Sequence, residues 1–252
     1  MTIFTILTFF ILGTIIGSFL NVVILRYNTG VSITGRSGCF SCGKKLEWYE
    51  LVPILSFLFL RGKCSKCKTK ISWQYPLVEL ATGLLFAFYI FIFVPNFSFY
   101  FLIPTSYYLV IFSLLIVITV YDLRHKIIPD GLVFTFIGLA FLKLFYYTNI
   151  LDILAGPILF IPFFLLWYLS KGKWMGFGDA KLAIGIGFFM GFAGGVSSII
   201  LGFWIGAIAG LLWIGISAMF GKHIGMKSEI PFAPYLILGM LITFFFHINV
   251  IM

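Results

Sequence analysis

Long apolar runs dominate this chain and restrict what it can fold into. Hydrophobic residues make up 62% of its 252 residues and charged residues only 10%, which is far too apolar for a soluble domain. Several runs reach the roughly 20 residues that a helix needs to cross the hydrocarbon core of a bilayer. We therefore predict an all-α polytopic membrane protein with about eight transmembrane helices, near residues 2–25, 77–94, 100–121, 131–148, 150–169, 181–197, 198–220 and 230–248.

The basic residues indicate how these spans are oriented. A net charge of +9 would suit a nucleic-acid binder, but Lys and Arg cluster in a few connections between spans, so we expect no nucleic-acid partner. Nine of the 17 basic residues lie in the connection 26–70. Because cytoplasmic connections carry an excess of Lys and Arg, this connection is predicted to be cytoplasmic. Eight spans then return the basic connections 122–130, 171–180 and 221–229 to the same side.

This pattern divides the chain into three parts. Residues 1–25 are predicted to be a first transmembrane helix, because they lack the basic start and small-residue cleavage site of a secretory signal. Residues 26–76 contain all four cysteines and most of the net positive charge, and are predicted to form a small cytoplasmic domain. Its apolar stretch 51–60 is too short to cross the membrane, so we expect it to lie on the membrane surface or to form the core of that domain. Residues 77–252 form the membrane-embedded core.

The four cysteines form two C-x-x-C pairs, Cys39 with Cys42 and Cys64 with Cys67, separated by 21 residues. This spacing is typical of tetrahedral zinc sites with four thiolate ligands. Two disulfides or four unremarkable thiols are the alternatives, and a reducing cytoplasm disfavours disulfides. Four thiolates leave no coordination position open, so the predicted zinc folds the domain and does not activate water.

Two aspartates lie at the borders of predicted spans. Asp122 follows the third span, and Asp179 precedes the sixth, after Gly176 and Gly178. Because two spans separate these aspartates, both belong to the same membrane border, where acids are costly and therefore point to function. An aspartyl protease needs two carboxylates that share a proton, one as a base toward water and one as an acid toward the substrate carbonyl. The pair suggests an intramembrane aspartyl peptidase, with glycines that let a substrate backbone or a neighbouring helix come close to Asp179.

Each acid also has a purely structural interpretation. Asp122 could belong to an interfacial charge cluster, and Asp179 could cap the sixth helix. Either interpretation would be favoured for one acid alone, but the two together favour a catalytic pair. We expect Asp130 to be a helix N-cap without a chemical role. Glu79, near the cytoplasmic end of the second span, needs a partner or a polar cavity.

In their order along the chain, these motifs resemble the type IV prepilin leader peptidases. The resemblance covers nearly the whole chain. It rests on the two cysteine pairs, on the segment 122–130 with an aspartate at each end, and on four further segments, GSFLNVV (17–23), YPLVEL (75–80), GFGDAKL (176–182) and IPFAPY (230–235).

The resemblance implies an aspartyl peptidase of the G-x-G-D class in the bacterial cytoplasmic membrane, with its active site on the cytoplasmic side. Asp122 and Asp179 match the catalytic pair of the family. Its substrates are prepilins and pseudopilins of type IV pili, type II secretion and competence systems, whose basic leader is cut after a glycine and before an apolar helix. Many members also transfer a methyl group from S-adenosylmethionine to the new amino terminus. Members without the cysteine-bearing loop look like peptidases only, so residues 26–76 favour both activities.

The methyl-donor site is not marked by a motif, because residues 26–76 contain no glycine-rich nucleotide loop. The polar candidates for the methyltransferase are Asn21, Glu47, Glu50 and Glu79. Many bifunctional members have Asp-Asn where this chain has Glu50-Leu51, so a peptidase without methyltransferase activity is an alternative.

Two other classes of function are alternatives. An ion-coupled transporter would place acids near mid-membrane and would show an internal repeat, and we find neither in the sequence. A membrane-anchored zinc scaffold would leave the two aspartates without an explanation.

Overall fold

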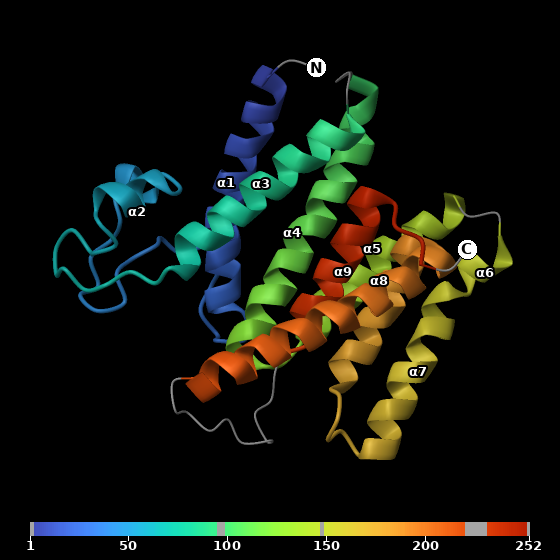
Figure 1. Cartoon of the computed structure of the whole chain (residues 1–252). Coiled ribbons are helices and arrows are strands. Elements are labelled where there is room, and N and C mark those ends of the chain that lie inside the picture. Colours follow the sequence, from blue (N-terminus) through green and yellow to red (C-terminus); the bar gives the residue numbers. More distant parts are fainter. Residues whose placement is uncertain (1–2, 95–98, 147–148, 220–230, 251–252) are drawn as a thin grey trace. The chain divides into compact units, whose positions relative to one another are not determined.

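The computed structural model describes residues 3–94, 99–146, 149–219 and 231–250. These residues form helices and connections without a β-strand (Figure 1), and the four-cysteine domain adds two isolated β-bridges. The chain divides into two compact units, residues 1–117 and 118–252, with the boundary inside α4. The connection 221–229, which we predict to be cytoplasmic, lies outside the described residues.

The first unit is built on two close-packed helices, α1 (Ile3–Arg26) and α3 (Gln74–Phe93). Glycines bring their backbones together, because a Cβ on Gly17 would lie 2.8 Å from the Cα of Glu79. Small residues at helix interfaces are common in membranes, where packing replaces the hydrophobic effect. After η2 (Phe99–Phe101), α4 (Leu102–His125) contacts α3 through aromatic rings, with Tyr89 5.2 Å from Tyr108 between ring centroids.

The four-cysteine domain is mostly irregular chain around η1 (Trp48–Leu51) and α2 (Leu55–Phe59). In the apolar stretch 51–60, Phe57 is buried and packs on Trp73, with 5.0 Å between the ring centroids. Leu55, Leu58 and Phe59 are exposed. The stretch therefore contributes to the core of the domain through Phe57 and presents an apolar face outward.

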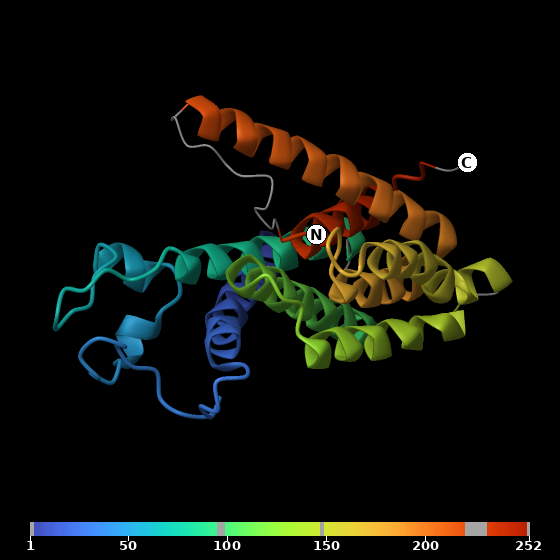
Figure 2. The same ribbon diagram turned by 90° about the horizontal axis from the view of Figure 1, so that it is seen from below.

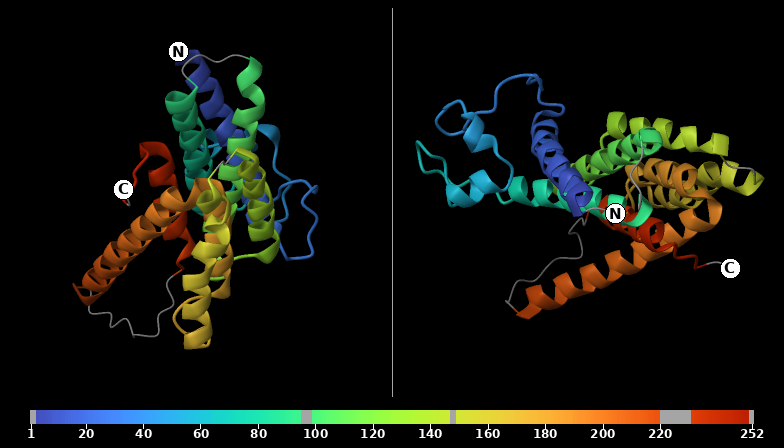
Figure 3. Two further views of the ribbon diagram at one scale, coloured as in Figure 1. Left: turned by 90° about the vertical axis from the view of Figure 1, so that its right-hand side faces the viewer. Right: turned by 90° about the horizontal axis from the view of Figure 1, so that it is seen from above.

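The second unit is organised around α8 (Phe177–Met219), which contacts four other helices (Figure 3). These helices, with the 3-10 turn η3, are α5 (Asp130–Phe141), η3 (Leu142–Tyr146), α6 (Ile150–Ile153), α7 (Ala155–Ser170) and α9 (Ala233–Phe246). Glycines again set the spacing, since a Cβ on Gly239 of α9 would lie 2.3 Å from the carbonyl oxygen of Ser198 in α8. α9 thus rests directly on the backbone of α8.

A kink at Gly191 divides α8 into two helices (Figure 2). Gly191 has a φ of 73°, and the side chain of Asp152 accepts a hydrogen bond of 2.8 Å from the freed N–H of Phe192. Lys143 donates a 2.7 Å hydrogen bond to the carbonyl of Phe189. Both contacts satisfy backbone groups that the break would leave unpaired. From hydropathy we predicted that one span ends at 197 and the next begins at 198, but the helix breaks earlier, at Gly191. The break occurs there because Asp152 of α6 and Lys143 of η3 bind the backbone groups beside Gly191.

Within the described ranges, four helices are long and apolar enough to cross a membrane, namely α1, α3, α4 and Phe177–Ser217 of α8. The last measures 41 residues, about 60 Å at the rise of an α-helix and about twice the hydrocarbon thickness, so its kink allows two passes. α7 and α9 are apolar but shorter. The chain is therefore an all-α, multi-pass membrane protein, and the count of eight spans stays a prediction.

The contact between α8 and α9 gives a test of this packing. Replacing Gly239 with Ala puts a methyl group against backbone that cannot move aside, so we expect a loss of roughly 1–3 kcal/mol, as for overpacked cores. The matched control is Gly138→Ala in α5, where an added Cβ meets nothing within 4 Å, and which should be neutral or stabilising by up to about 1 kcal/mol. Thermal unfolding of both proteins in detergent checks this, and equal melting temperatures would contradict the packing.

Candidate active site

The two predicted aspartates belong to the second unit, and each lies near the end of a helix. Asp122 is in the last turn of α4, and Asp179 is in the first turn of α8. Both helices thus extend past the span borders that we predicted from hydropathy. Both residues are buried, with 4% of Asp122 and 7% of Asp179 exposed. Burial of two carboxylates in an apolar protein is costly and calls for a chemical explanation.

Asp122 is oriented by the start of α9. Its Oδ2 atom accepts a hydrogen bond of 3.2 Å from the backbone N–H of Ala233, the first residue of α9. The first N–H groups of a helix have no partner within the helix and carry a partial positive charge, so a carboxylate suits this position. No local sequence pattern reveals this role of the segment 230–235, because the contact joins residues 111 positions apart.

Asp179 is less satisfied than Asp122. In the described part of the chain, its buried Oδ1 atom has no hydrogen-bond partner. The carboxylates of Asp179 and Asp122 lie near enough for their charges to interact. A pair of carboxylates that interact in this way is the arrangement in which one proton can be shared. The structure therefore brings the two predicted aspartates together in the second unit.

The two glycines before Asp179 allow close packing. A Cβ on Gly178 would lie 2.8 Å from the Cβ of Ile128, so only glycine lets this residue approach the start of α8. A Cβ on Gly176 would lie 3.4 Å from Oδ2 of Asp179. Gly178 thus lets the connection before α5 pack against the start of α8, and Gly176 leaves the space beside the Asp179 carboxylate without a side chain.

Asp130 does not cap α5 as we predicted. Pro129 occupies the N-cap position, and the Asp130 side chain forms an ion pair with Lys181 of α8. The Asp130 side chain is 65% exposed, so this pair is worth little energy. The cause of the difference is tertiary, because Lys181 offers the carboxylate a charged partner that no sequence-local pattern reveals.

The four cysteines form one cluster in the first unit. The four sulfur atoms lie within 4.8 Å of one another, and Sγ of Cys39 is 3.7 Å from Sγ of Cys67. Thiolates around a tetrahedral zinc would lie about 3.8 Å apart, given a Zn–S bond of about 2.3 Å. All four cysteines are free, without a disulfide. The donor set fits a tetrahedral zinc with no open position.

The two cysteine pairs have the same backbone turn. The N–H of Cys39 donates to the carbonyl of Lys44, and the N–H of Cys64 donates to that of Thr69, each at 2.9 Å. The residues that close the turns, Gly43 and Lys68, have φ values of 67° and 61°. Two equivalent turns present their sulfur atoms to one point.

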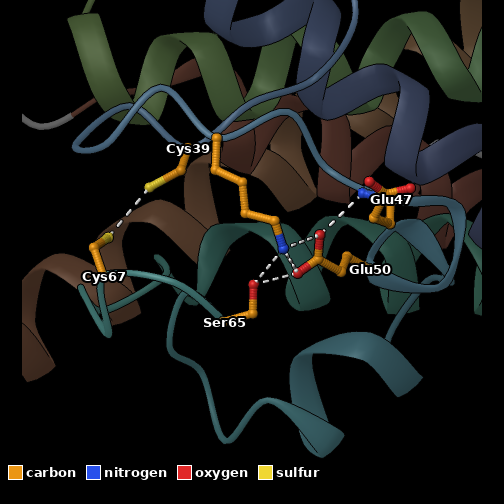
Figure 4. A network of polar contacts seen from close by, with 6 residues as sticks. Cys39, Glu47, Glu50, Ser65 and Cys67 are labelled. Carbon is orange, nitrogen blue, oxygen red and sulfur yellow. Dashed lines mark hydrogen bonds and ion pairs between the residues drawn. The ribbon is translucent and has the colours of Figure 1, made fainter.

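Glu50 joins these two turns (Figure 4). Its side chain is 1% exposed and accepts hydrogen bonds of 2.8 and 3.0 Å from Nζ of Lys44, beside the first pair. Ser65, between the cysteines of the second pair, donates to the same carboxylate, and so does the N–H of Glu47, at 2.9 Å. Bonds from Lys44, Ser65 and the Glu47 backbone lower the pKa of Glu50 to about 2. The stability that this network contributes is therefore present at neutral pH and is lost as the pH falls toward that value.

The four methyltransferase candidates fall into two groups. Asn21 in α1 and Glu79 in α3 lie on the packed helices, whereas Glu47 and Glu50 lie in the four-cysteine domain. Asn21 is fully buried, and its side-chain amide donates to the carbonyl of Tyr75 at 3.2 Å. Glu79 is buried and accepts a 2.7 Å hydrogen bond from the N–H of Ile54. Glu47 is exposed.

Comparisons with known proteins match both units. Residues 11–93 match the Bacterial Peptidase A24 N-terminal domain, and residues 109–211 match the Type IV leader peptidase family. No solved structure matches the chain.

Three similar proteins are each named "Prepilin leader peptidase/N-methyltransferase". The protein from Bacillus subtilis (strain 168) is 32% identical over 249 residues, which cover 96% of this chain and 94% of the relative. The protein from Klebsiella pneumoniae is 31% identical over 71% of this chain and 82% of the relative. The protein from Myxococcus xanthus (strain DK1622) is 39% identical over 71% of this chain, and the match spans about half, 54%, of that relative. Motifs, helical architecture and these matches agree, and the chain belongs to the type IV leader peptidase family.

Proposed function

We propose that this protein is a membrane aspartyl peptidase that removes the basic leader from type IV prepilins or pseudopilins. One observation carries the proposal, namely that Asp122 and Asp179 are buried together in the second unit, near enough for their charges to interact. In the described residues neither carboxylate has a cationic partner. The names of the relatives supply the substrate class.

The pair would hydrolyse the peptide bond by general acid–base catalysis. With one proton shared between Asp122 and Asp179, the ionised carboxylate takes a proton from water, and the water oxygen attacks the substrate carbonyl carbon. The protonated carboxyl donates its proton to the carbonyl oxygen. The C–N bond then breaks as a hydroxyl of the tetrahedral intermediate returns its proton to the carboxylate that had donated one, and the nitrogen receives the proton that was taken from water. The N–H of Ala233 keeps Asp122 oriented through these steps.

The cytoplasmic border is the proposed place of this reaction, because the connection 26–70 carries nine of the 17 basic residues. A protein with a net charge of +9 does not attract a basic leader over long distances. Recognition of the substrate therefore depends more on its apolar helix than on its basic leader, since this helix can pack among the helices of residues 77–252. These residues, as the peptidase core, would thus select the substrate by its helix.

We also propose that the protein methylates the amino terminus that cleavage exposes. Residues 26–76 would serve this activity as a zinc-stabilised domain, with Cys39, Cys42, Cys64 and Cys67 as the ligands. S-adenosylmethionine would supply the methyl group when bound. The match of residues 11–93 to the A24 N-terminal domain and the names of the relatives support this second activity.

Exchange of one catalytic carboxyl gives the first test. Asp179→Asn should keep the fold but lower the cleavage rate by at least about 100-fold, because an amide cannot take part in the proton transfer. The control is Asp130→Asn, which changes an exposed carboxylate and should leave cleavage within about twofold. Mass spectrometry of a co-expressed prepilin reports both results, and normal processing by D179N would refute the catalytic pair.

Removal of one metal ligand gives the second test. Purified protein should contain one zinc per chain by elemental analysis, and Cys39→Ser should lower this to a small fraction, because three thiolates bind zinc far more weakly than four. Without zinc, residues 26–76 should become sensitive to protease. A full zinc content in C39S would contradict the four-thiolate site.

The contact between the two cysteine pairs gives a third test. Glu50→Gln should speed the loss of zinc to a chelator, because the neutral amide holds Lys44 more weakly and the two turns then separate more easily. The matched control is Glu47→Gln, which changes an exposed side chain three residues away. Rates of zinc transfer to a chromogenic chelator at pH 7 measure the effect, and equal rates for the two variants would exclude the role of Glu50.

A further inference from the structure

Glu79 is a buried acid that the peptidase reaction does not use. Only 6% of this residue is exposed, and its Oε2 accepts the N–H of Ile54 at 2.7 Å, with the Ser18 side chain as a second hydrogen-bonding neighbour. Throughout the residues that the structure describes, no basic side chain forms an ion pair with it. A buried carboxylate without a counter-charge is unfavourable, so a carboxyl group in this position either takes up a proton or binds a cation.

The surroundings of Glu79 are rigid. Gly17 in α1 brings its backbone against the Cα of Glu79, which leaves the carboxylate in the seam between α1 and α3. One turn further along α1, Asn21 donates to Gly17 at 3.3 Å and to the carbonyl of Tyr75, and accepts a 3.2 Å bond from Gln74. These contacts fix the first turn of α3 to α1 and hold Glu79 at a defined place.

The four-cysteine domain reaches this seam through Ile54. This β-branched residue has a φ of 61°, a strained conformation that is found mainly where neighbouring structure enforces it. Its N–H points at Glu79. The zinc domain and the acid are therefore parts of one structure, so the domain can position the site.

The other polar candidates do not fit a cation site. The carboxylate of Glu50 is fully engaged with Lys44, Ser65 and the N–H of Glu47. Glu47 itself is exposed, and Asn21 is neutral with all three of its contacts made inside the protein. Glu79 alone among the four combines burial with a carboxyl group that forms no ion pair in the described residues.

We propose that Glu79 binds the ammonium group at the new amino terminus of the processed substrate and removes its proton for methyl transfer. The inference rests on the proposed function. One proton moves from the substrate nitrogen to the carboxylate, and the nitrogen lone pair then attacks the methyl carbon of the sulfonium donor. A C–N bond forms, the C–S bond breaks with its electron pair on sulfur, and the methylated nitrogen carries the positive charge.

The first experiment separates methylation from cleavage in the full-length protein. Glu79→Gln should cleave a co-expressed prepilin as the wild type does, but should methylate the product at least about 100-fold more slowly. The matched control is Thr82→Val, a change of similar volume at a fully buried residue one turn away, whose hydroxyl bonds only to its own helix. Leader loss and methyl gain are separate mass changes. Normal methylation by E79Q would overturn the proposal.

The second experiment measures binding without the methyl donor. A peptide with the mature amino-terminal sequence should bind the wild type about tenfold more tightly, or better, with a free amine than with an acetylated one. E79Q should lose this difference, and T82V should keep it. Failure of the wild type to distinguish the two peptides overturns the proposal even if E79Q does not fold.

The outcomes also separate this inference from the proposed function. A wild type that leaves co-expressed prepilin uncut refutes the peptidase, whatever Glu79 does. Loss of methylation in E79Q with an unchanged preference for the free amine overturns the inference alone and assigns Glu79 to the donor. Loss of cleavage and methylation together, with a lower melting temperature, would make Glu79 a structural residue and also overturn it.

Discussion

The cost of burying a carboxylate among apolar helices governs this structure. Three buried acids and one half-buried acid on its helices meet that cost in different ways. Asp152 caps the second half of α8 at its kink, Glu79 accepts the N–H of Ile54, and Asp122 accepts the N–H of Ala233. Asp179 keeps an oxygen without a partner in the described residues. Three acids are matched to backbone donors, and the least satisfied one stands beside a second carboxylate, which is where proton transfer is most natural.

Glycine packing determines whether these backbone donors reach their acids. Gly239 lets α9 rest on the backbone of α8, and the first N–H of α9 then meets Asp122. Gly178 lets Ile128 come close to the start of α8, where Asp179 lies. Gly17 brings α1 onto α3 beside Glu79. The same small residues that replace the hydrophobic effect between membrane helices thus also shape the polar sites.

The four-cysteine domain combines two ways of holding an irregular loop together. The sulfur cluster fixes two equivalent turns at one point, and the network of Glu50, Lys44 and Ser65 joins the same turns a second time. A small domain with little apolar core needs such links. One of its connections to the helices passes through Ile54, so its order and the surroundings of Glu79 depend on each other.

The sequence by itself determined the properties that depend on composition and local spacing. Apolar runs of sufficient length required membrane helices, two C-x-x-C pairs in one connection indicated a four-thiolate cluster, and two acids at matching borders indicated Asp122 and Asp179. Only the tertiary structure decided the partners of buried groups, because these come from segments distant in the chain. Examples are Ala233 for Asp122, Lys181 for Asp130, and Asp152 for the kink at Gly191. Hydropathy measures how favourably a segment leaves water, but it does not say which backbone N–H or side chain then replaces that water.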